Sequence, residues 1–104
     1  MAGKRREGRI LAAQFLYMRE VGVAGVSLEQ ALSDFWEQTE AEKPAQEFAE
    51  KRIRSVIEKQ GEVDQELRKL VTNWDPERLA PVDRAILRLG LWEMKFAEIG
   101  RAHV

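Results

Sequence analysis

Residues 81–96, PVDRAILRLGLWEMKF, carry the most apolar helical pattern of the chain and decide its fold. Pro81 follows a short turn at residues 77–79, and apolar side chains then cover nearly the whole circumference of a helix. They are Val82, Ala85, Ile86, Leu87, Leu89, Leu91, Trp92, Met94 and Phe96. A helix that is apolar on most faces is expected in the middle of a bundle. Arg84 and Arg88, one turn apart, are its main polar exceptions.

The segments upstream also follow the helical period, and none of them alternates as a strand does. Residues 6–21 predict a largely buried helix that ends at Gly22 and Gly25. Ser27 and Gln30 have the spacing of a capping box, which predicts the start of a second helix. Its apolar face contains Leu28, Ala31, Leu32, Phe35 and Trp36.

A third helix is expected after a polar loop at residues 37–43, because Pro44 suits a first helical turn. Its inward side chains are predicted to be Phe48, Ala49, Ile53, Val56 and Ile57. Gly61 either ends this helix or is tolerated inside it, and the apolar period continues to Trp74 in both cases. Asp75 precedes a proline and is therefore pushed out of the helical region. The prediction is an all-α bundle of about five helices.

The composition limits what this domain can do. The chain has 104 residues, 44% hydrophobic and 34% charged, which is typical of one small globular domain. It has no cysteine and its single histidine is His103, so we expect no disulfide, no metal site and no cofactor. No apolar run could cross a bilayer, and no secretory signal follows the first residues. A cytoplasmic protein without a membrane partner is expected.

Catalytic groups are not indicated either. The acidic pairs Glu40/Glu42 and Glu62/Asp64 lie in polar segments, without the apolar surroundings that raise the pKa of a carboxyl group. Ser27 is better explained as a helix cap than as a nucleophile. The sequence contains no glycine-rich phosphate loop. We therefore expect that the chain is not an enzyme.

The net charge of −1 hides a basic start. This basic head consists of Lys4, Arg5, Arg6 and Arg9, with Glu7 as the single acidic residue among them. Residues 20–50, in contrast, carry eight acidic side chains and one lysine. Polyanions respond to local charge within about 8 Å at physiological salt, so the head can bind phosphates on a neutral domain. A frayed, solvated chain end explains the same cluster, and charge alone does not decide between the two.

Gln14 and Tyr17 continue along the same helix. An amide and an aromatic ring near guanidinium groups are the mixture that recognises single-stranded RNA. A surface glutamine and a tyrosine at the edge of the core explain these two residues equally well. The residues alone leave RNA binding open.

Two motifs resemble the NusB family. Residues 5–17, RREGRILAAQFLY, are similar to the opening helix of NusB proteins, and residues 74–93 resemble the most characteristic block of the family. That block contains Trp74, Arg78, Leu79, the run from Val82 to Leu89, and Glu93. The resemblance covers about residues 4–98 and implies a NusB-like helical fold.

The resemblance also implies a role in processive transcription antitermination on ribosomal RNA operons. NusB proteins pair with NusE, a small-subunit ribosomal protein, bind a single-stranded boxA element in nascent RNA, and help to load it onto RNA polymerase. Position by position, the implied RNA-binding residues are Lys4, Arg5, Arg6, Arg9, Gln14 and Tyr17. Asp83 matches an acidic position at the NusE-facing surface, and Arg84 and Arg88 are neighbouring candidates.

The chain departs from the family pattern in two places. Glu7 interrupts the basic run where many relatives have a basic residue. After Glu98 and Ile99, NusB proteins continue with a turn and two more helices, which residues 100–104, GRAHV, do not resemble. We expect a C-terminally truncated member: residues 1–99 as an incomplete NusB-like RNA-binding domain lacking the last two helices, and residues 100–104 as a non-native or out-of-frame tail.

Two other functions fit the same residues. One is the NusB-like N-terminal RNA-binding domain of a ribosomal RNA cytosine methyltransferase, whose catalytic domain would lie downstream. The other is a helical adaptor that binds protein only. The Arg-rich start directly after Met1 favours the stand-alone factor over the methyltransferase.

Overall fold

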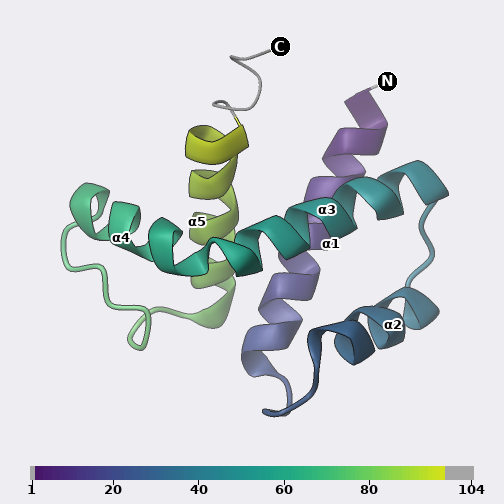
Figure 1. Cartoon of the computed structure of the whole chain (residues 1–104), viewed down its shortest axis with the longest axis horizontal. Helices are drawn as coiled ribbons and strands as arrows, with labels where there is room; N and C mark the ends of the chain where they lie inside the picture. The colour runs from purple at the N-terminus through teal and green to yellow at the C-terminus, as the bar shows by residue number, and fades with distance from the viewer. Residues whose placement is uncertain (1, 98–104) are drawn as a thin grey trace.

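The computed structural model describes residues 2–97, which form five α-helices and a short π-helical turn (Figure 1). The elements are α1 (Ala2–Val21), α2 (Leu28–Gln38), α3 (Lys43–Glu58), α4 (Gln60–Leu70), α5 (Pro81–Trp92) and η1 (Glu93–Ala97). No strand occurs between residues 2 and 97, and the predicted all-helical fold is confirmed. Within the same range, no helix combines the length and the apolar character needed to cross a membrane.

The helices lie in two layers. α3 and α4 follow one another and cross in front of α1 and α5, which run in opposite directions and contact each other (Figure 1). α2 lies beside the C-terminal half of α1. The domain measures 39 × 37 × 20 Å, and its shortest dimension corresponds to two helices of about 10 Å each. Such a thin slab leaves the outer face of each layer without a covering helix in residues 2–97.

The start of α1 differs from the prediction, whereas the start of α2 agrees with it. α1 begins at Ala2 rather than Arg6, so the whole basic head is helical. α2 begins as predicted after Ser27, whose Oγ accepts a hydrogen bond from the backbone N–H of Gln30 at 3.1 Å. Only this half of the capping box forms, because the side chain of Gln30 donates to Asp34 at 2.8 Å instead of returning to the cap.

The end of the third helix also differs. The chain bends at Lys59, with φ −97° and ψ 10°, and Gly61 lies in the first turn of α4. Helical hydrogen bonds continue through the bend, from the Lys59 N–H to Ser55 and from the Val63 N–H to Lys59. α4 then ends at Leu70, before the predicted break at Asp75. Asn73 adopts φ 64°, a left-handed conformation that asparagine tolerates, and this turn separates Trp74 from the helix.

The core consists of two clusters. The larger one joins α1, α2, α3 and α5, and its innermost residues include Ala12, Phe15, Ala49, Ile53 and Val56. The smaller one consists of Val63, Leu67, Trp74 and Leu91, with Trp92 packed against both clusters. α5 therefore contributes to both cores, as expected for a central helix. It is not buried on all its apolar faces, since Val82 and Ile86 are 45% and 55% exposed. Met94, in the η1 turn that follows, is 63% exposed.

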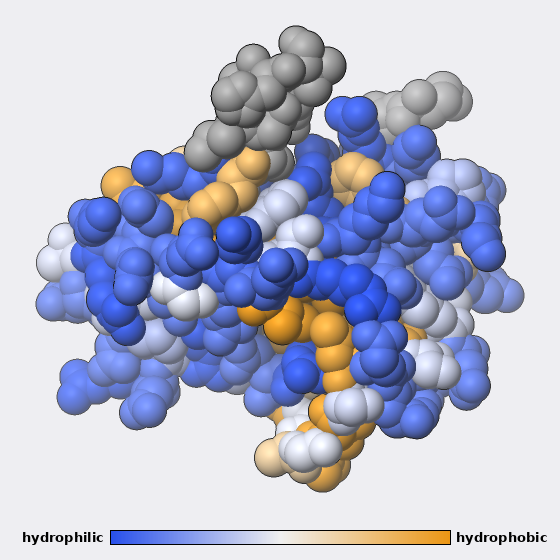
Figure 2. All heavy atoms as spheres, in the orientation of Figure 1, coloured by the Kyte–Doolittle hydropathy of each residue, from blue (hydrophilic) through white to orange (hydrophobic). Residues whose placement is uncertain are grey.

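The front face is mainly charged. Figure 2 shows polar and charged residues over most of the α3–α4 side, with an apolar area below α3 near the loop that joins α1 to α2. In that loop Val23 is 83% and Val26 40% exposed. The surface of the domain therefore includes an exposed apolar area as well as charged faces.

Candidate nucleic-acid interface

The basic head occupies the first turns of α1. Lys4, Arg5 and Arg6 are exposed, and the first turn of the helix contains no acidic residue. The free N–H groups at a helix start add positive potential there, which favours bound anions. Arg5 and Arg9 are four residues apart and share one face of the helix. Glu7 is exposed in the same stretch and lowers the local positive charge.

Arg9 is partly engaged inside the protein. Its Nε donates a hydrogen bond to Glu93 Oε2 at 2.7 Å, and its side chain is 42% exposed. Arg52 Nε lies 3.3 Å from the same carboxylate oxygen. The Arg52 guanidinium group also stacks on Phe48 and Trp92, at 4.8 and 4.7 Å from the ring centroids. The sequence does not indicate that Arg52 and Glu93 belong to this cluster, because their proximity depends on how α1, α3 and η1 pack.

Gly8 allows α1 to lie this close to α3. A Cβ atom at Gly8 would be 2.5 Å from Phe48 Cδ1, a distance that requires the ring to move. The absence of a side chain at Gly8 therefore allows Phe48, and Arg52 one turn later on α3, to pack close to the basic head. A glycine inside a helix costs about 0.5–1 kcal/mol relative to alanine, so its presence is consistent with a packing role.

Gln14 and Tyr17 lie further along α1 than the basic head. Both are exposed, but Tyr17 follows Arg5 by twelve residues, which is about 18 Å along a helix axis. Tyr17 lies one turn before Glu20, and Glu20 pairs with Arg84 and Arg88 of α5. The structure thus places Tyr17 near the start of α5 and away from Arg5.

Asp83, Arg84 and Arg88 have different environments. Asp83 is exposed. Arg88 is only 7% exposed, and its guanidinium group pairs with both oxygens of Asp64, at 2.9 and 3.0 Å, and with Glu20 at 2.7 Å. Arg84 donates to the carbonyl groups of Pro76 and Leu79 and to Glu20.

These contacts tie α1 and α4 to α5. The Asp64 side chain is 15% exposed and belongs to this network, contrary to its predicted position in a solvated polar segment. A buried arginine on an otherwise apolar helix needs a carboxylate as a partner. The sequence therefore indicates that Arg88 forms an ion pair. The sequence does not indicate which carboxylate pairs with Arg88.

An apolar face connects Tyr17 with the start of α5. From α1, Glu20 reaches α5 and Arg9 reaches η1, which directly follows α5. The residues that follow Arg9 and Glu20 are Ile10 and Val21, which are 51% and 52% exposed. On α5, Ile86 follows the buried Ala85 in the same way. In an antiparallel pair of helices, the residue that follows a contact residue points to the same side of the pair on both helices. Ile10, Val21 and Ile86 therefore lie on one side of the α1–α5 layer. The α1–α5 apolar face consists of Ile10, Tyr17, Val21, Val82 and Ile86.

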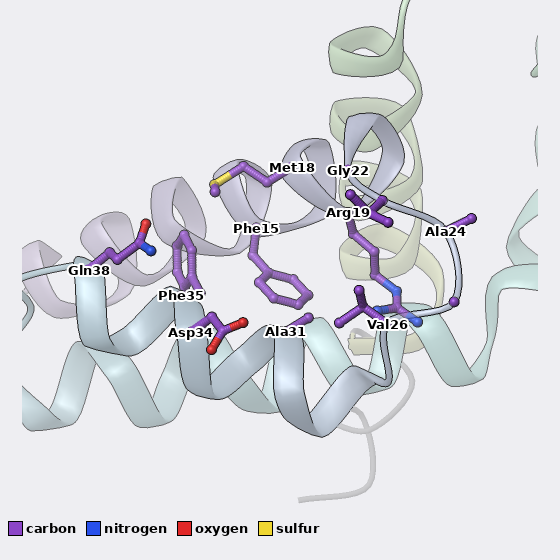
Figure 3. A pocket seen from close by; sticks show the side chains of 12 residues that line it. Phe15, Met18, Arg19, Gly22, Ala24, Val26, Ala31, Asp34, Phe35 and Gln38 are labelled. Atoms are coloured by element: carbon purple, nitrogen blue, oxygen red, sulfur yellow. The ribbon is translucent and has the colours of Figure 1, made fainter.

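A separate cavity of about 350 Å³ lies between the end of α1, the following loop and α2 (Figure 3). Phe15, Phe35 and Val26 give it apolar walls, and Arg19 and Asp34 are its charged residues. This mixture could accommodate an apolar group. It does not bring together a nucleophile with a general base, nor a pair of carboxyl groups.

Within residues 2–97, histidine, cysteine, aspartate and glutamate side chains form no group of three or more that could hold a metal ion. A basic helix start lies at one end of the α1–α5 layer, and an apolar face beside an exposed carboxylate lies toward the other. These features define a helical binding domain.

Comparison with known proteins identifies the family. A family model described as the NusB family matches residues 6–104, and the chain belongs to this family. The resemblance of the two sequence motifs is thereby confirmed. No solved structure matches the chain significantly.

Three similar proteins are each named transcription antitermination protein NusB. The one from Sorangium cellulosum is 40% identical over 96% of this chain and 71% of its own length. Those from Methylacidiphilum infernorum and Bacillus subtilis are each 36% identical, over 88% and 91% of this chain and 64% and 68% of their own lengths. The chain thus spans about two thirds of the length of these relatives. The predicted division at residue 99 and the tail at residues 100–104 lie outside the described residues.

Proposed function

We propose that this protein is a non-enzymatic transcription antitermination factor that binds single-stranded RNA of the boxA type. The observation that carries the proposal is the basic head, whose Lys4, Arg5 and Arg6 are all exposed on the first turns of one helix. The three relatives bear the name of an antitermination protein and none of them that of a methyltransferase, which favours the stand-alone factor. This function places the protein in the bacterial cytoplasm, where transcription takes place.

The basic head suits a flexible RNA strand better than a structured ligand. Exposed arginine side chains in consecutive turns offer several N–H donors, and guanidinium groups match phosphate oxygens in geometry and charge. Affinity is then expected to come mainly from phosphate contacts and to depend strongly on salt.

The second proposed surface binds a protein partner, NusE, within the antitermination complex on RNA polymerase. Asp83 is exposed at the start of α5, beside the α1–α5 apolar face. An apolar patch next to a charged residue is typical of protein interfaces. We place Tyr17 on this surface rather than with the RNA. Arg84 and Arg88 then hold α5 in position, since their guanidinium groups bind Glu20 and Asp64.

The RNA proposal is tested by removing two arginines from the head. Fluorescence anisotropy would measure binding of a labelled single-stranded boxA-type oligonucleotide to the wild type and to Arg5→Ala/Arg6→Ala, from 50 to 200 mM salt. We expect at least about ten-fold weaker binding at low salt, and a salt slope smaller by about 1.4, because each lost phosphate contact on a single strand removes about 0.7.

The matched control is Lys51→Ala/Arg68→Ala, which removes the same charge from exposed positions on α3 and α4. This control should retain most of the affinity. Equal losses in both double variants would show that only net charge matters, and no loss in the Arg5/Arg6 variant would exclude the basic head as the RNA site.

A further inference from the structure

One carboxylate oxygen lies between two guanidinium groups at the edge of the basic head. Glu93 Oε2 accepts a hydrogen bond from Arg9 Nε at 2.7 Å and lies 3.3 Å from Arg52 Nε. The three residues come from η1, α1 and α3, so the cluster forms only when the domain is folded. It is the one place where an acidic side chain binds a member of the basic head in the described part of the chain.

Glu93 occupies the position that an RNA phosphate would take on Arg9. Carboxylate and phosphate oxygens use the same N–H donors of a guanidinium group, with similar geometry. Arg9 cannot give its Nε–H to both anions at once. A negative charge at this position also repels a phosphate that approaches the head.

The cluster is built so that Arg9 can leave it. Arg9 is 42% exposed, whereas Arg52 and Glu93 are 15% and 20% exposed. Arg52 stacks on Phe48 and Trp92 at 4.8 and 4.7 Å from the ring centroids, whereas Arg9 lies 5.9 Å from the Phe48 centroid. We therefore expect Arg52 to stay beside Glu93 when Arg9 moves. The carboxylate therefore keeps a cationic neighbour, and the outer arginine can exchange one anion for another at little cost.

We propose that Glu93 competes with RNA phosphate for Arg9 and thereby sets the affinity of the basic head. In the free protein Glu93 holds Arg9, and in the complex a phosphodiester oxygen replaces the carboxylate. The proposal rests on the proposed RNA-binding function, and it assigns to Glu93 a role that weakens binding.

The first test is Glu93→Gln in the full chain, with the same single-stranded oligonucleotide as probe. Removing the competing charge should tighten binding about three- to ten-fold at 50 mM salt and steepen the salt dependence. Glu62→Gln is the matched control, because Glu62 is an ion-paired, exposed carboxylate on α4, far along the chain from the head. It should change affinity by less than two-fold.

The second test places Glu93→Gln in an Arg9→Ala background. If Glu93 acts through Arg9, the gain disappears there, because no guanidinium group remains to be released. An equal gain with and without Arg9 would overturn the proposal in favour of a general charge effect. Unchanged or weaker RNA binding by a folded Glu93→Gln variant would overturn it as well.

A direct measurement covers the case in which Glu93→Gln does not fold. In the wild type, the Arg9 Nε–H signal in an NMR spectrum should shift when RNA is added, since its acceptor changes. A signal that does not move at saturating RNA contradicts the competition. The Arg5→Ala/Arg6→Ala variant separates the two proposals: if it binds RNA normally, both fail, and if it binds weakly while Glu93→Gln shows no gain, only the competition fails.

Discussion

Arg88 shows how a single charged residue organises the domain. Its side chain is 8% exposed and reaches two carboxylates, Asp64 on α4 and Glu20 on α1. Both oxygens of Asp64 receive a hydrogen bond. A buried pair of this kind is not a large net source of stability, but losing one member leaves the other charge uncompensated.

Replacing Arg88 by alanine should therefore be strongly destabilising. We expect a loss of about 3–5 kcal/mol in the free energy of unfolding, measured by urea denaturation followed by circular dichroism. Arg54→Ala is the control, since Arg54 also binds two carboxylates, Glu29 and Glu50, but in an exposed setting. It should cost much less. Similar losses for the two variants would contradict the role of burial.

The pair formed by Glu29 and Arg54 predicts a specific acid dependence. Arg54 donates hydrogen bonds of 2.6 and 2.9 Å to Glu29, and they hold the pKa of that carboxyl group below its ordinary value of 4.5. Because the folded state binds this proton less readily than the unfolded state, the pair contributes stability above about pH 4.5. The contribution is lost as the pH falls through the lowered pKa.

Glu29→Gln should remove this part of the acid sensitivity. The urea midpoints of the variant and the wild type should differ near pH 7 and converge below pH 4. A difference that stays constant between pH 7 and pH 3 would show that the pair does not shift the titration of Glu29. Because both side chains are exposed, high salt should also reduce the difference.

At the scale of elements, the contact between α1 and α3 depends on Gly8. Gly8→Ala should destabilise the domain by about 1–3 kcal/mol, because the new methyl group collides with Phe48. Gly90→Ala is the matched substitution in α5, where, apart from the adjoining helix backbone, no atom of residues 2–97 lies within 4 Å of the added Cβ. It should stabilise the domain by about 0.5–1 kcal/mol through helix propensity. Thermal unfolding of both variants measures the difference, and shifts of the same sign would refute the packing argument.

The helices themselves could be predicted because their signals are local. The apolar period marks α1 and α5, and Ser27 and Pro44 mark the starts of α2 and α3. The bend at Lys59 could not be predicted, since the helical hydrogen bonds continue through it without a proline. Gly61 is the only nearby residue that indicates a helix end, and it lies two residues after the bend.

The candidate site was predictable only in part, for a related reason. Exposure of the basic head follows from charge and position. The contacts of Arg9 and Arg88 do not, because they join residues 84 and 68 positions apart. A pattern of residue types cannot say which carboxylate meets which arginine across such distances. The same limit applies to Tyr17, because its place beside α5 depends on how α1 packs and not on the residues around it in the sequence.

At the scale of the whole molecule, the two proposed surfaces lie at opposite ends of the antiparallel pair α1 and α5. Arg9 meets Glu93 at one end, and Glu20 meets Arg84 at the other. The proposed RNA site lies at the first end and the proposed protein site at the second. Such a separation allows RNA and a protein partner to bind at the same time.

Asp83→Arg tests the second surface independently of the first. The variant should bind NusE at least about ten-fold more weakly in a pull-down or calorimetric assay, because a like charge or a mismatched contact at an interface centre costs over 1 kcal/mol. RNA affinity should not fall, since the added charge is positive. A loss of helical circular dichroism would instead show that Asp83 supports the fold.

The most direct test of the two-surface account is an RNA titration of the ¹⁵N-labelled chain, followed by NMR. We expect chemical-shift changes at Lys4, Arg5, Arg6 and Arg9, with smaller ones at Glu93. Tyr17 and Asp83 should not respond. Changes centred on Tyr17 and Asp83, or no change at saturating RNA, would contradict the central claim that the start of α1 is the RNA-binding surface.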